Sequence, residues 1–195
     1  MQRRNFLAGA GAALLMPALP AFALTESSAE RLVSALVGDI NTVIASGKGE
    51  NAMFRDFERI FARYSDTSYI AAYTMGVDGR RASNAQKRAF SSAFQGYISR
   101  KYGKRFREFI GGRLEVKRVR QVKNWYEVET TAFLRNEAPF TVTFHVSARS
   151  GKDLFFNMFI DGVNLLLTER TEIGALIDRN GGNIDAMISD LKKAG

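Results

Sequence analysis

Trp125-Tyr126-Glu127-Val128-Glu129-Thr130-Thr131-Ala132-Phe133-Leu134 opens the stretch that decides the fold, which runs from Asn124 to Val163. Two further runs of the same kind follow, Phe140-Thr141-Val142-Thr143-Phe144-His145-Val146 and Leu154-Phe155-Phe156-Asn157-Met158-Phe159-Ile160. All three are rich in Val, Thr, Phe and Tyr, which favour strands, and the polar segments 136–139 and 150–153 between them are typical of turns. The stretch therefore predicts an antiparallel meander.

Alternation gives this meander one strongly apolar face, because successive side chains of a strand point to opposite faces. The second run divides into Phe140, Val142, Phe144 and Val146 on one face, and Thr141, Thr143 and His145 on the other. The first run places together Tyr126, Val128, Thr130, Ala132 and Leu134. The third is expected to place Phe155 and Phe159 opposite Leu154, Phe156, Met158 and Ile160. An apolar face of this size must be covered, and the rest of the chain supplies helical patterns that can cover it.

Helical spacing of apolar residues predicts four helices before the meander. The first is expected to open at the capping box Ser27-x-x-Glu30, and the second carries the aromatic stripe Phe54, Phe57, Phe61 and Tyr64. Asp66 is expected to cap a third helix over 67–75. Ser83-x-x-Gln86 is a capping box that opens the longest pattern, which continues to residue 110.

A charged run over 114–122 has the character of an edge strand, and two short helices are expected after Asn164, the second capped by Asn183. Helices, four strands and then helices again indicate an α+β fold with segregated elements. The expected architecture is helices covering a curved, mostly antiparallel four-stranded sheet.

The first residues have the pattern of a signal peptide. Arg3 and Arg4 precede a short run rich in Ala, Gly and Leu, and Pro20-Ala21-Phe22-Ala23 offers a small-residue cleavage site. Arg3-Arg4-Asn5-Phe6-Leu7 also resembles the twin-arginine export signal. We expect residues 1–23 to be removed and 24–195 to form a single exported domain.

Composition narrows the chemistry that the chain can perform. Its 195 residues are 46% apolar and include no Cys, so disulfides and thiolate metal sites are excluded. His145 is the one histidine, which excludes catalytic triads and His-based metal sites, and a structural role is expected for it. Basic residues of the strand over 114–122 are expected to neutralise Glu127 and Glu129, and Asp161 is expected to cap a turn or helix. An enzyme acting on an apolar substrate through Glu129 or Asp161 remains an alternative.

The long helical pattern is basic, with Lys87, Arg88, Arg100, Lys101, Lys104, Arg105 and Arg107. These residues favour an acidic partner or anionic lipid headgroups about as much as an ordinary solvated helix face. A ligand-free adaptor that binds through this helix is therefore a second alternative. Nucleic acid is disfavoured as a partner because the signal directs the chain out of the cytoplasm.

Three helices and the sheet each present a large apolar face. These faces could pack together as a filled core. They could equally close incompletely and leave an elongated apolar cavity for acyl chains. Periodicity alone does not separate the two.

Several local motifs, in order along nearly all of the chain after residue 23, resemble the MlaC or toluene-tolerance family. These are Phe54-Arg55-Asp56-Phe57-Glu58-Arg59-Ile60, Ile70-Ala71-Ala72-Tyr73-Thr74-Met75-Gly76, Gln86-x-x-x-Phe90-x-x-x-Phe94 with Tyr102, and Ile160-Asp161-Gly162-Val163-Asn164-Leu165. The resemblance implies a cone-like sheet of the nuclear-transport-factor type with an apolar pocket for lipid tails.

The resemblance also implies function. It implies a periplasmic carrier of phospholipid, with no enzymatic activity and no cofactor other than its cargo. The implied partners are an inner-membrane ABC transporter complex and an outer-membrane lipoprotein and porin complex, and a monomer is expected. The family pattern and the alternation together predict tail contacts from Tyr73, Phe90, Phe94, Tyr97, Ile98, Val128, Ala132, Phe140, Val142, Phe144, Phe156, Met158 and Ile160.

Overall fold

A computed structural model describes residues 24–103 and 110–195. The helices in chain order are α1 (Glu26–Ala45), α2 (Glu50–Tyr64), α3 (Thr67–Met75), the 3₁₀ helix η1 (Asp78–Arg80), α4 (Asn84–Gly103), α5 (Leu165–Arg179) and α6 (Ile184–Leu191). Between α4 and α5 lie β1 (Arg113–Val122), β2 (Trp125–Phe133), β3 (Phe140–Ser147), β4 (Leu154–Ile160) and β5 (Val163–Asn164). The expected signal peptide over 1–23 and positions 104–109 of the predicted long helix lie outside the described residues.

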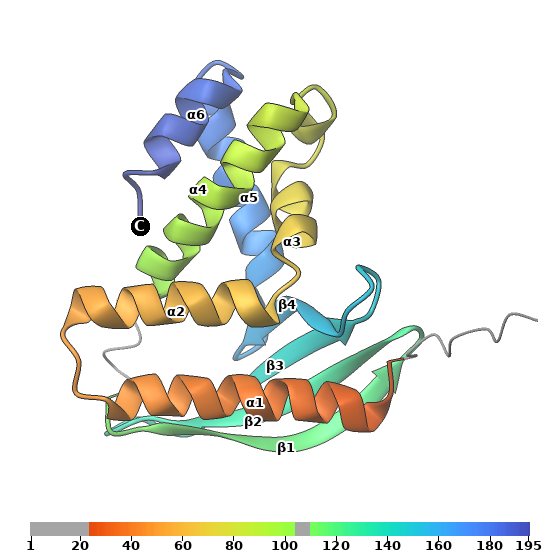
Figure 1. Cartoon of the computed structure of the whole chain (residues 1–195), viewed down its shortest axis with the longest axis vertical. Coiled ribbons are helices and arrows are strands. Elements are labelled where there is room, and N and C mark those ends of the chain that lie inside the picture. Colours follow the sequence, from red (N-terminus) through yellow and green to blue (C-terminus); the bar gives the residue numbers. More distant parts are fainter. Residues whose placement is uncertain (1–23, 104–109) are drawn as a thin grey trace, which may run out of the picture.

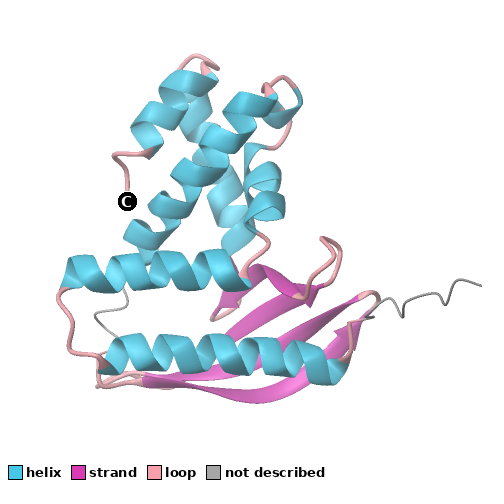
Figure 2. Cartoon of the chain, in the orientation of Figure 1, coloured by secondary structure: helices cyan, strands magenta, loops and turns pink. Residues whose placement is uncertain are grey.

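The five strands form one curled antiparallel sheet in the order β1-β2-β3-β4-β5, and Figure 2 shows it at the base of a largely helical molecule. The α+β prediction is confirmed, with five strands rather than four. The additional strand, β5, is only Val163–Asn164, which pairs with Phe159 and Ile160 of β4. Two residues are too few to show an alternating pattern, so the sequence could not reveal this strand.

The predicted faces of β2 and β3 are confirmed by their register. Val128 is the partner of Phe144 and Thr130 is the partner of Val142, so these side chains share the inner face. Thr130 is fully buried there, and its hydroxyl donates a hydrogen bond to the carbonyl of Val142 at 2.9 Å. A polar residue therefore fits this apolar face because the hydrogen-bonding capacity of its hydroxyl is used.

The predicted alternation is wrong in the first half of β4. Phe155 is the partner of Val146, and a register shift follows it, so Phe155 lies on the inner face with its ring 5.6 Å from that of Phe144. Leu154 and Phe156 leave that face, and the ring of Phe156 lies 5.8 Å from the Trp125 ring. The irregularity is a β-bulge, in which one extra residue on a strand reverses the facing of those before it.

Helices cover the inner face in two groups. The first helical group is α1 and α2: Figure 1 shows α1 lying along the sheet, where it contacts β1, β2 and β3, and α2 running beside it. The second helical group is α3, α4, α5 and α6, which pack on one another above β4. β1 lies at the edge of the sheet, as its charged sequence predicts. The curled sheet and the two helical groups thus surround one hydrophobic interior.

Most predicted helix caps are confirmed. The Asp66 carboxylate accepts a hydrogen bond from the backbone N–H of Tyr69, and Asn183 caps α6 in the same way. Ser83 and Gln86 form the reciprocal pair of a capping box.

The start of α1 differs from the prediction. Its capping box is Thr25 with Ser28, whose side chains exchange hydrogen bonds with each other's backbone N–H groups, so the helix begins before the predicted Ser27 box. A Ser can take the third helical position as well as Glu, and the sequence offered two overlapping candidates.

Candidate functional site

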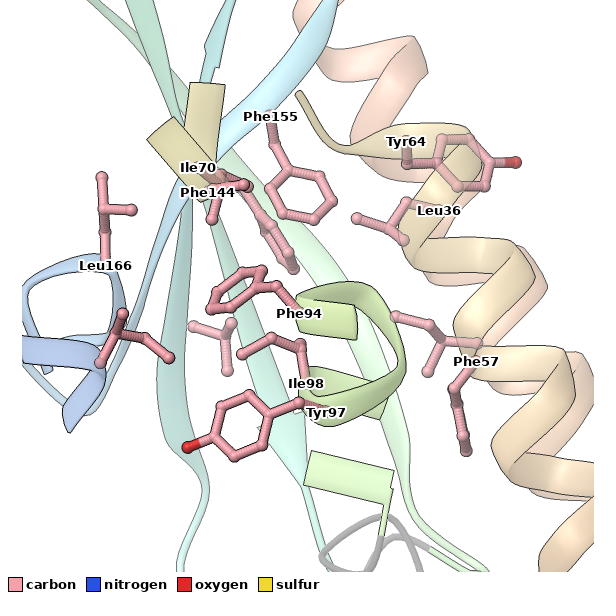
Figure 3. Packing of buried hydrophobic residues seen from close by; sticks show 14 of the residues in the cluster. Leu36, Phe57, Tyr64, Ile70, Phe94, Tyr97, Ile98, Phe144, Phe155 and Leu166 are labelled. Atoms are coloured by element: carbon pink, nitrogen blue, oxygen red, sulfur yellow. The ribbon is translucent and has the colours of Figure 1, made fainter. Parts of the chain in front are cut away.

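An apolar pocket of about 150 Å³ lies where the two helical groups meet the sheet. Figure 3 shows Phe94 and Ile98 of α4 among side chains from the sheet and from α1 and α2. The wall consists of Leu36, Ile40, Phe57, Ile60, Phe61, Ile70, Phe94, Ile98, Ser99, Tyr102, Leu114, Val142, Phe144, Phe155, Phe156, Asn157, Met158, Ile160, Leu165, Leu166 and Glu169. Eight helices and strands contribute, so the pocket exists only in the assembled fold.

The structure brings about half of the predicted contact residues to this pocket. The ones that line it are Phe94, Ile98, Val142, Phe144, Phe156, Met158 and Ile160. Phe156 lies beside the bulge of β4, and its ring also packs against Tyr69, with the centroids 5.6 Å apart. The role of these residues in lipid contact remains a prediction.

The other predicted residues lie elsewhere in the interior. Val128 and Ala132 are fully buried under the first helical group, and Phe140 pairs with Ala132 at the end of the strand. Phe90 is fully buried beside Phe94, with the ring centroids 5.6 Å apart.

Two predicted tyrosines make polar contacts rather than lining the pocket. Tyr97 donates a hydrogen bond from its hydroxyl to Glu172 Oε2 at 2.8 Å. Tyr73 lies under the guanidinium group of Arg170, which is 5.0 Å from its ring centroid.

The walls supplied by α1, α2 and α5 were missed by the sequence analysis. The signal was present for Phe57 and Phe61, which belong to the aromatic stripe that predicted α2, and for Leu36 and Ile40 in the stripe of α1. A stripe shows that a helix face is buried, but the facing partner depends on how the helices pack. The register of the stripes against the sheet therefore had to come from the structure.

Glu169 is the least expected residue of the wall, because its carboxylate is buried with a 4% exposed side chain. Its Oε1 atom accepts hydrogen bonds from Lys101 Nζ at 2.7 Å and from the Tyr102 hydroxyl at 2.5 Å. Its Oε2 atom and the Ser99 hydroxyl have no hydrogen-bond partner among the described residues. A buried carboxylate is costly unless it is paired, and Lys101 supplies that pairing at one end of an otherwise apolar wall.

Lys101 joins this carboxylate to a second one on the next turn of α5. Its Nζ atom lies 2.6 Å from Glu172 Oε2, and hydrogen bonds from Lys101 and Tyr97 lower the pKa of Glu172 although partial burial alone would raise it. Burial raises the pKa of the Tyr97 hydroxyl, and the neighbouring charges of Glu169 and Glu172 raise it further. The tyrosine therefore stays protonated and donates to Glu172.

The two carboxylates that the enzymatic alternative relied on, Glu129 and Asp161, are not part of the pocket wall. Arg118 pairs with Glu129 at 2.8 Å and Arg120 pairs with Glu127, as predicted. Asp161 is exposed in the turn between β4 and β5, and Asn164 rather than Asp161 caps α5 by accepting from the N–H of Leu167.

His145 is buried on the outer face of the sheet. Its ring lies 4.2 Å from the ring of Trp125 and 4.8 Å from that of Phe159, and its Nε2 atom is 3.6 Å from Glu127 Oε1. Burial lowers the pKa of His145 below 6.5, although the charge of Glu127 opposes the shift. The packing agrees with a structural histidine.

Two further observations concern residues 24–103 and 110–195. They contain no group of three or more His, Cys, Asp or Glu side chains that could hold a metal ion. No helix in this part of the chain has the length and apolar character needed to span a membrane.

A curled sheet covered by helices around an apolar pocket defines an α+β protein with a small apolar hollow in its interior. The chain belongs to the MlaC protein family, whose model matches residues 31–193. Its fold is similar to that of a phospholipid-binding protein from Ralstonia solanacearum, solved in complex with a phospholipid at 1.53 Å. The two share a TM-score of 0.72 and 17% identity over 85% of this chain and 95% of the other. No curated protein sequence matches the chain.

Proposed function

We propose that this protein is a carrier that binds the acyl chains of a phospholipid in the apolar pocket. The observation that carries the proposal is the pocket itself, whose wall is apolar apart from a few polar groups such as Ser99, Asn157 and Glu169. Membership of the MlaC family and the phospholipid-binding neighbour support the choice of ligand. The proposal includes export through the signal peptide over 1–23, a single domain over 24–195 in the periplasm, and shuttling of lipid between complexes of the inner and outer membranes.

Apolar burial alone is sufficient to hold such a ligand. Each methylene group moved from water into an apolar site contributes about 0.8 kcal/mol, so two chains of ordinary length need few specific polar contacts. This accounts for a site whose wall residues are mostly Phe, Ile, Leu and Val. Glu129 and Asp161, the two carboxylates of the enzymatic alternative, lie outside this wall.

The size of the pocket implies that its walls separate when lipid enters. Its volume of about 150 Å³ is well below the roughly 300–1,000 Å³ of pockets that hold drug-sized ligands. Loading two acyl chains therefore requires the first helical group, the second helical group or β4 to move outward. Docking on a membrane complex would supply the contacts that drive this opening and closing.

The alternatives predict different interiors. A ligand-free adaptor requires a solid core, whereas this interior contains a hollow bounded by apolar side chains. An enzyme that uses Glu129 or Asp161 requires one of them to reach the pocket, and Glu129 is instead held by Arg118 on the outer face. We therefore favour binding and transport without catalysis.

The test is chemical analysis of the purified protein. The exported protein would be purified without detergent and extracted with organic solvent, and the extract would be analysed by mass spectrometry. We expect phospholipid in a stoichiometric amount. A wild-type extract free of phospholipid would overturn the proposal.

A pair of variants tests the position of the site. Met158→Trp places a larger side chain at the pocket wall, and Thr141→Trp adds the same ring to the exposed outer face of the neighbouring strand. Phospholipid should fall strongly in the first and remain at the wild-type level in the second, with circular dichroism used to check that both fold. Equal phospholipid in the two variants would place the lipid outside this pocket.

A further inference from the structure

A second hollow, of about 680 Å³, lies between α3, η1 and the first half of α4. None of the residues that line it also lines the apolar pocket, which takes its α4 contacts from Phe94 onward. We call it the α3–α4 cleft. Figure 1 shows α3 and α4 side by side, with η1 in the connection between them.

The α3–α4 cleft has an apolar floor and a basic rim. Buried Ala71, Met75 and Phe90 form the floor. Small residues such as Ser68, Gly76, Ser91 and Ser92 keep the surface concave, and the exposed cations Arg80, Lys87 and Arg88 stand around it. Among the residues that the structure describes, no acidic side chain is part of the lining.

The three cations of the rim make no side-chain interaction with the described part of the chain. Within residues 24–103 and 110–195, the side chains of Arg80, Lys87 and Arg88 take part in no ion pair, hydrogen bond or ring contact. The adjacent Arg81 contrasts with them, because it pairs with Asp78 at 2.6 Å. The positive charge of the rim is therefore available to a partner.

Two of these cations also stand at an electrostatically unfavourable place. Lys87 and Arg88 lie near the beginning of α4, which starts at Asn84 and has no acidic residue in its first turn. The amino end of a helix carries partial positive charge, so it favours negative side chains and disfavours positive ones. An anionic group in the cleft would be attracted by all three cations.

We propose that the α3–α4 cleft is the docking site for an acidic, amphipathic segment of a partner protein. Apolar side chains of the segment would contact the floor, and its carboxylates would pair with the rim. The concave shape fits an inserted segment better than the flat surface of a membrane. This inference goes beyond lipid binding, because the cleft and the apolar pocket share no lining residue.

The probe is a fluorescent synthetic helical peptide with Glu on one face and Leu on the other, and its binding is measured by fluorescence anisotropy. The test variant is Arg80→Glu/Lys87→Glu/Arg88→Glu. The matched control is Lys123→Glu/Lys152→Glu/Lys193→Glu, which makes the same charge change at exposed positions outside both hollows.

At low ionic strength we expect the test variant to lose about tenfold or more in affinity, since three exposed charge pairs would be reversed. The control should lose less than about threefold, and wild-type binding should weaken as salt is added. An equal loss in both variants would show attraction to net charge alone and would overturn the proposal.

Two further measurements separate this proposal from its competitors. If vesicles of anionic phospholipid lose binding to the test variant while the peptide does not, the rim serves a membrane surface and the proposal is wrong. Phospholipid content measured by mass spectrometry should be unchanged in the test variant. Failure of the lipid-carrier proposal would appear as lipid-free wild-type protein, whatever the peptide does.

Discussion

The two hollows along α4, the apolar pocket and the α3–α4 cleft, differ in which parts of the chain form them. The apolar pocket beside the second half of the helix is enclosed by side chains from eight helices and strands, and Phe94, Val142 and Phe144 belong both to it and to the hydrophobic core. The α3–α4 cleft is formed by neighbours in sequence, and its cations make no ion pair or side-chain hydrogen bond with the described residues. Ligand binding in the pocket should therefore be coupled to the stability of the fold, whereas binding in the cleft should be separable from it.

The largest effect should come from removing a pocket wall. Phe94 is fully buried, with its ring 5.6 Å from Phe90 and 6.1 Å from Tyr97. Phe94→Ala should lower the free energy of unfolding by about 3–5 kcal/mol, because it leaves a cavity in the core, and it should reduce bound phospholipid. Urea unfolding measures the first effect and mass spectrometry of extracts measures the second.

Leu167→Ala is the control for this substitution. Leu167 is 52% exposed on α5 and lies outside the pocket, so its loss should change stability by no more than about 0.5 kcal/mol. The coupling argument would be wrong if Phe94→Ala changed stability as little as the control does.

A smaller effect is expected at the polar end of the pocket. Lys101→Met keeps most of the aliphatic chain but removes the charge that neutralises Glu169 and Glu172. The variant should lose about 1–3 kcal/mol of unfolding free energy at neutral pH, because a carboxylate stays buried without its cation. The loss should shrink in acid, because Lys101 lowers the pKa of Glu172 and this contribution disappears as pH falls through the lowered folded pKa and Glu172 takes up a proton.

Unfolding of this variant would be followed in urea at neutral pH and at about pH 4, below the ordinary pKa of a glutamate. Lys152→Met is the matched control, because Lys152 is exposed and no ion pair involves it among the described residues. A loss that stayed constant with pH would mean that packing rather than charge explains it.

The difference between the hollows also explains what the sequence could reveal. Alternation placed Val142 and Phe144 on the inner face, and their register confirms it, because each strand's pattern is local. The same reasoning failed at Phe155 and Phe156, where a bulge reverses the faces. A bulge depends on how β4 pairs with β3, and the sequence of β4 alone does not predict its position.

The charged parts of the two hollows show the same limit. The basic residues of α4 were evident in the sequence, but only the structure separates Lys101, which pairs with Glu169, from Lys87 and Arg88, which have no ion-pair partner in the part of the chain that the structure describes. Glu169 was not predicted at all, since a Glu in an amphipathic helix is ordinarily solvated. Pairing across elements requires the tertiary fold, and the α3–α4 cleft requires the orientation of two helices.

On the outer face of the sheet, His145 should make the stability of the fold depend on pH. Burial lowers the pKa of His145 in the folded protein below its ordinary 6.5, while Glu127 opposes and Arg120 adds to the shift. The unfolded chain therefore takes up a proton more readily. The part of the unfolding free energy that depends on His145 is fully present above pH 6.5, and it is lost as pH falls from there toward the lower folded pKa.

His145→Gln should remove this part of the pH dependence, because glutamine does not titrate. The measurement is the difference in unfolding free energy between neutral pH and about pH 5 for the variant and the wild type. Carboxylates titrate in both proteins and so cancel in the comparison. The same pH slope in both proteins would show that His145 does not contribute, and phospholipid content should be unaffected in either case.

The smallest change in unfolding free energy is expected at Lys87, and it tests whether the cleft serves a partner or the fold. Lys87→Glu exchanges a cation near the beginning of α4 for an anion, so it should raise the free energy of unfolding by about 0.3–1 kcal/mol through the helix dipole. Lys193→Glu makes the same exchange just after α6 ends, near the negative pole, and should lower stability slightly. Urea midpoints compare the two, and a loss of stability in Lys87→Glu would mean that the lysine supports the fold. If the substitution instead stabilises the protein and weakens binding of the acidic peptide, Lys87 serves a partner at a small cost to its own helix.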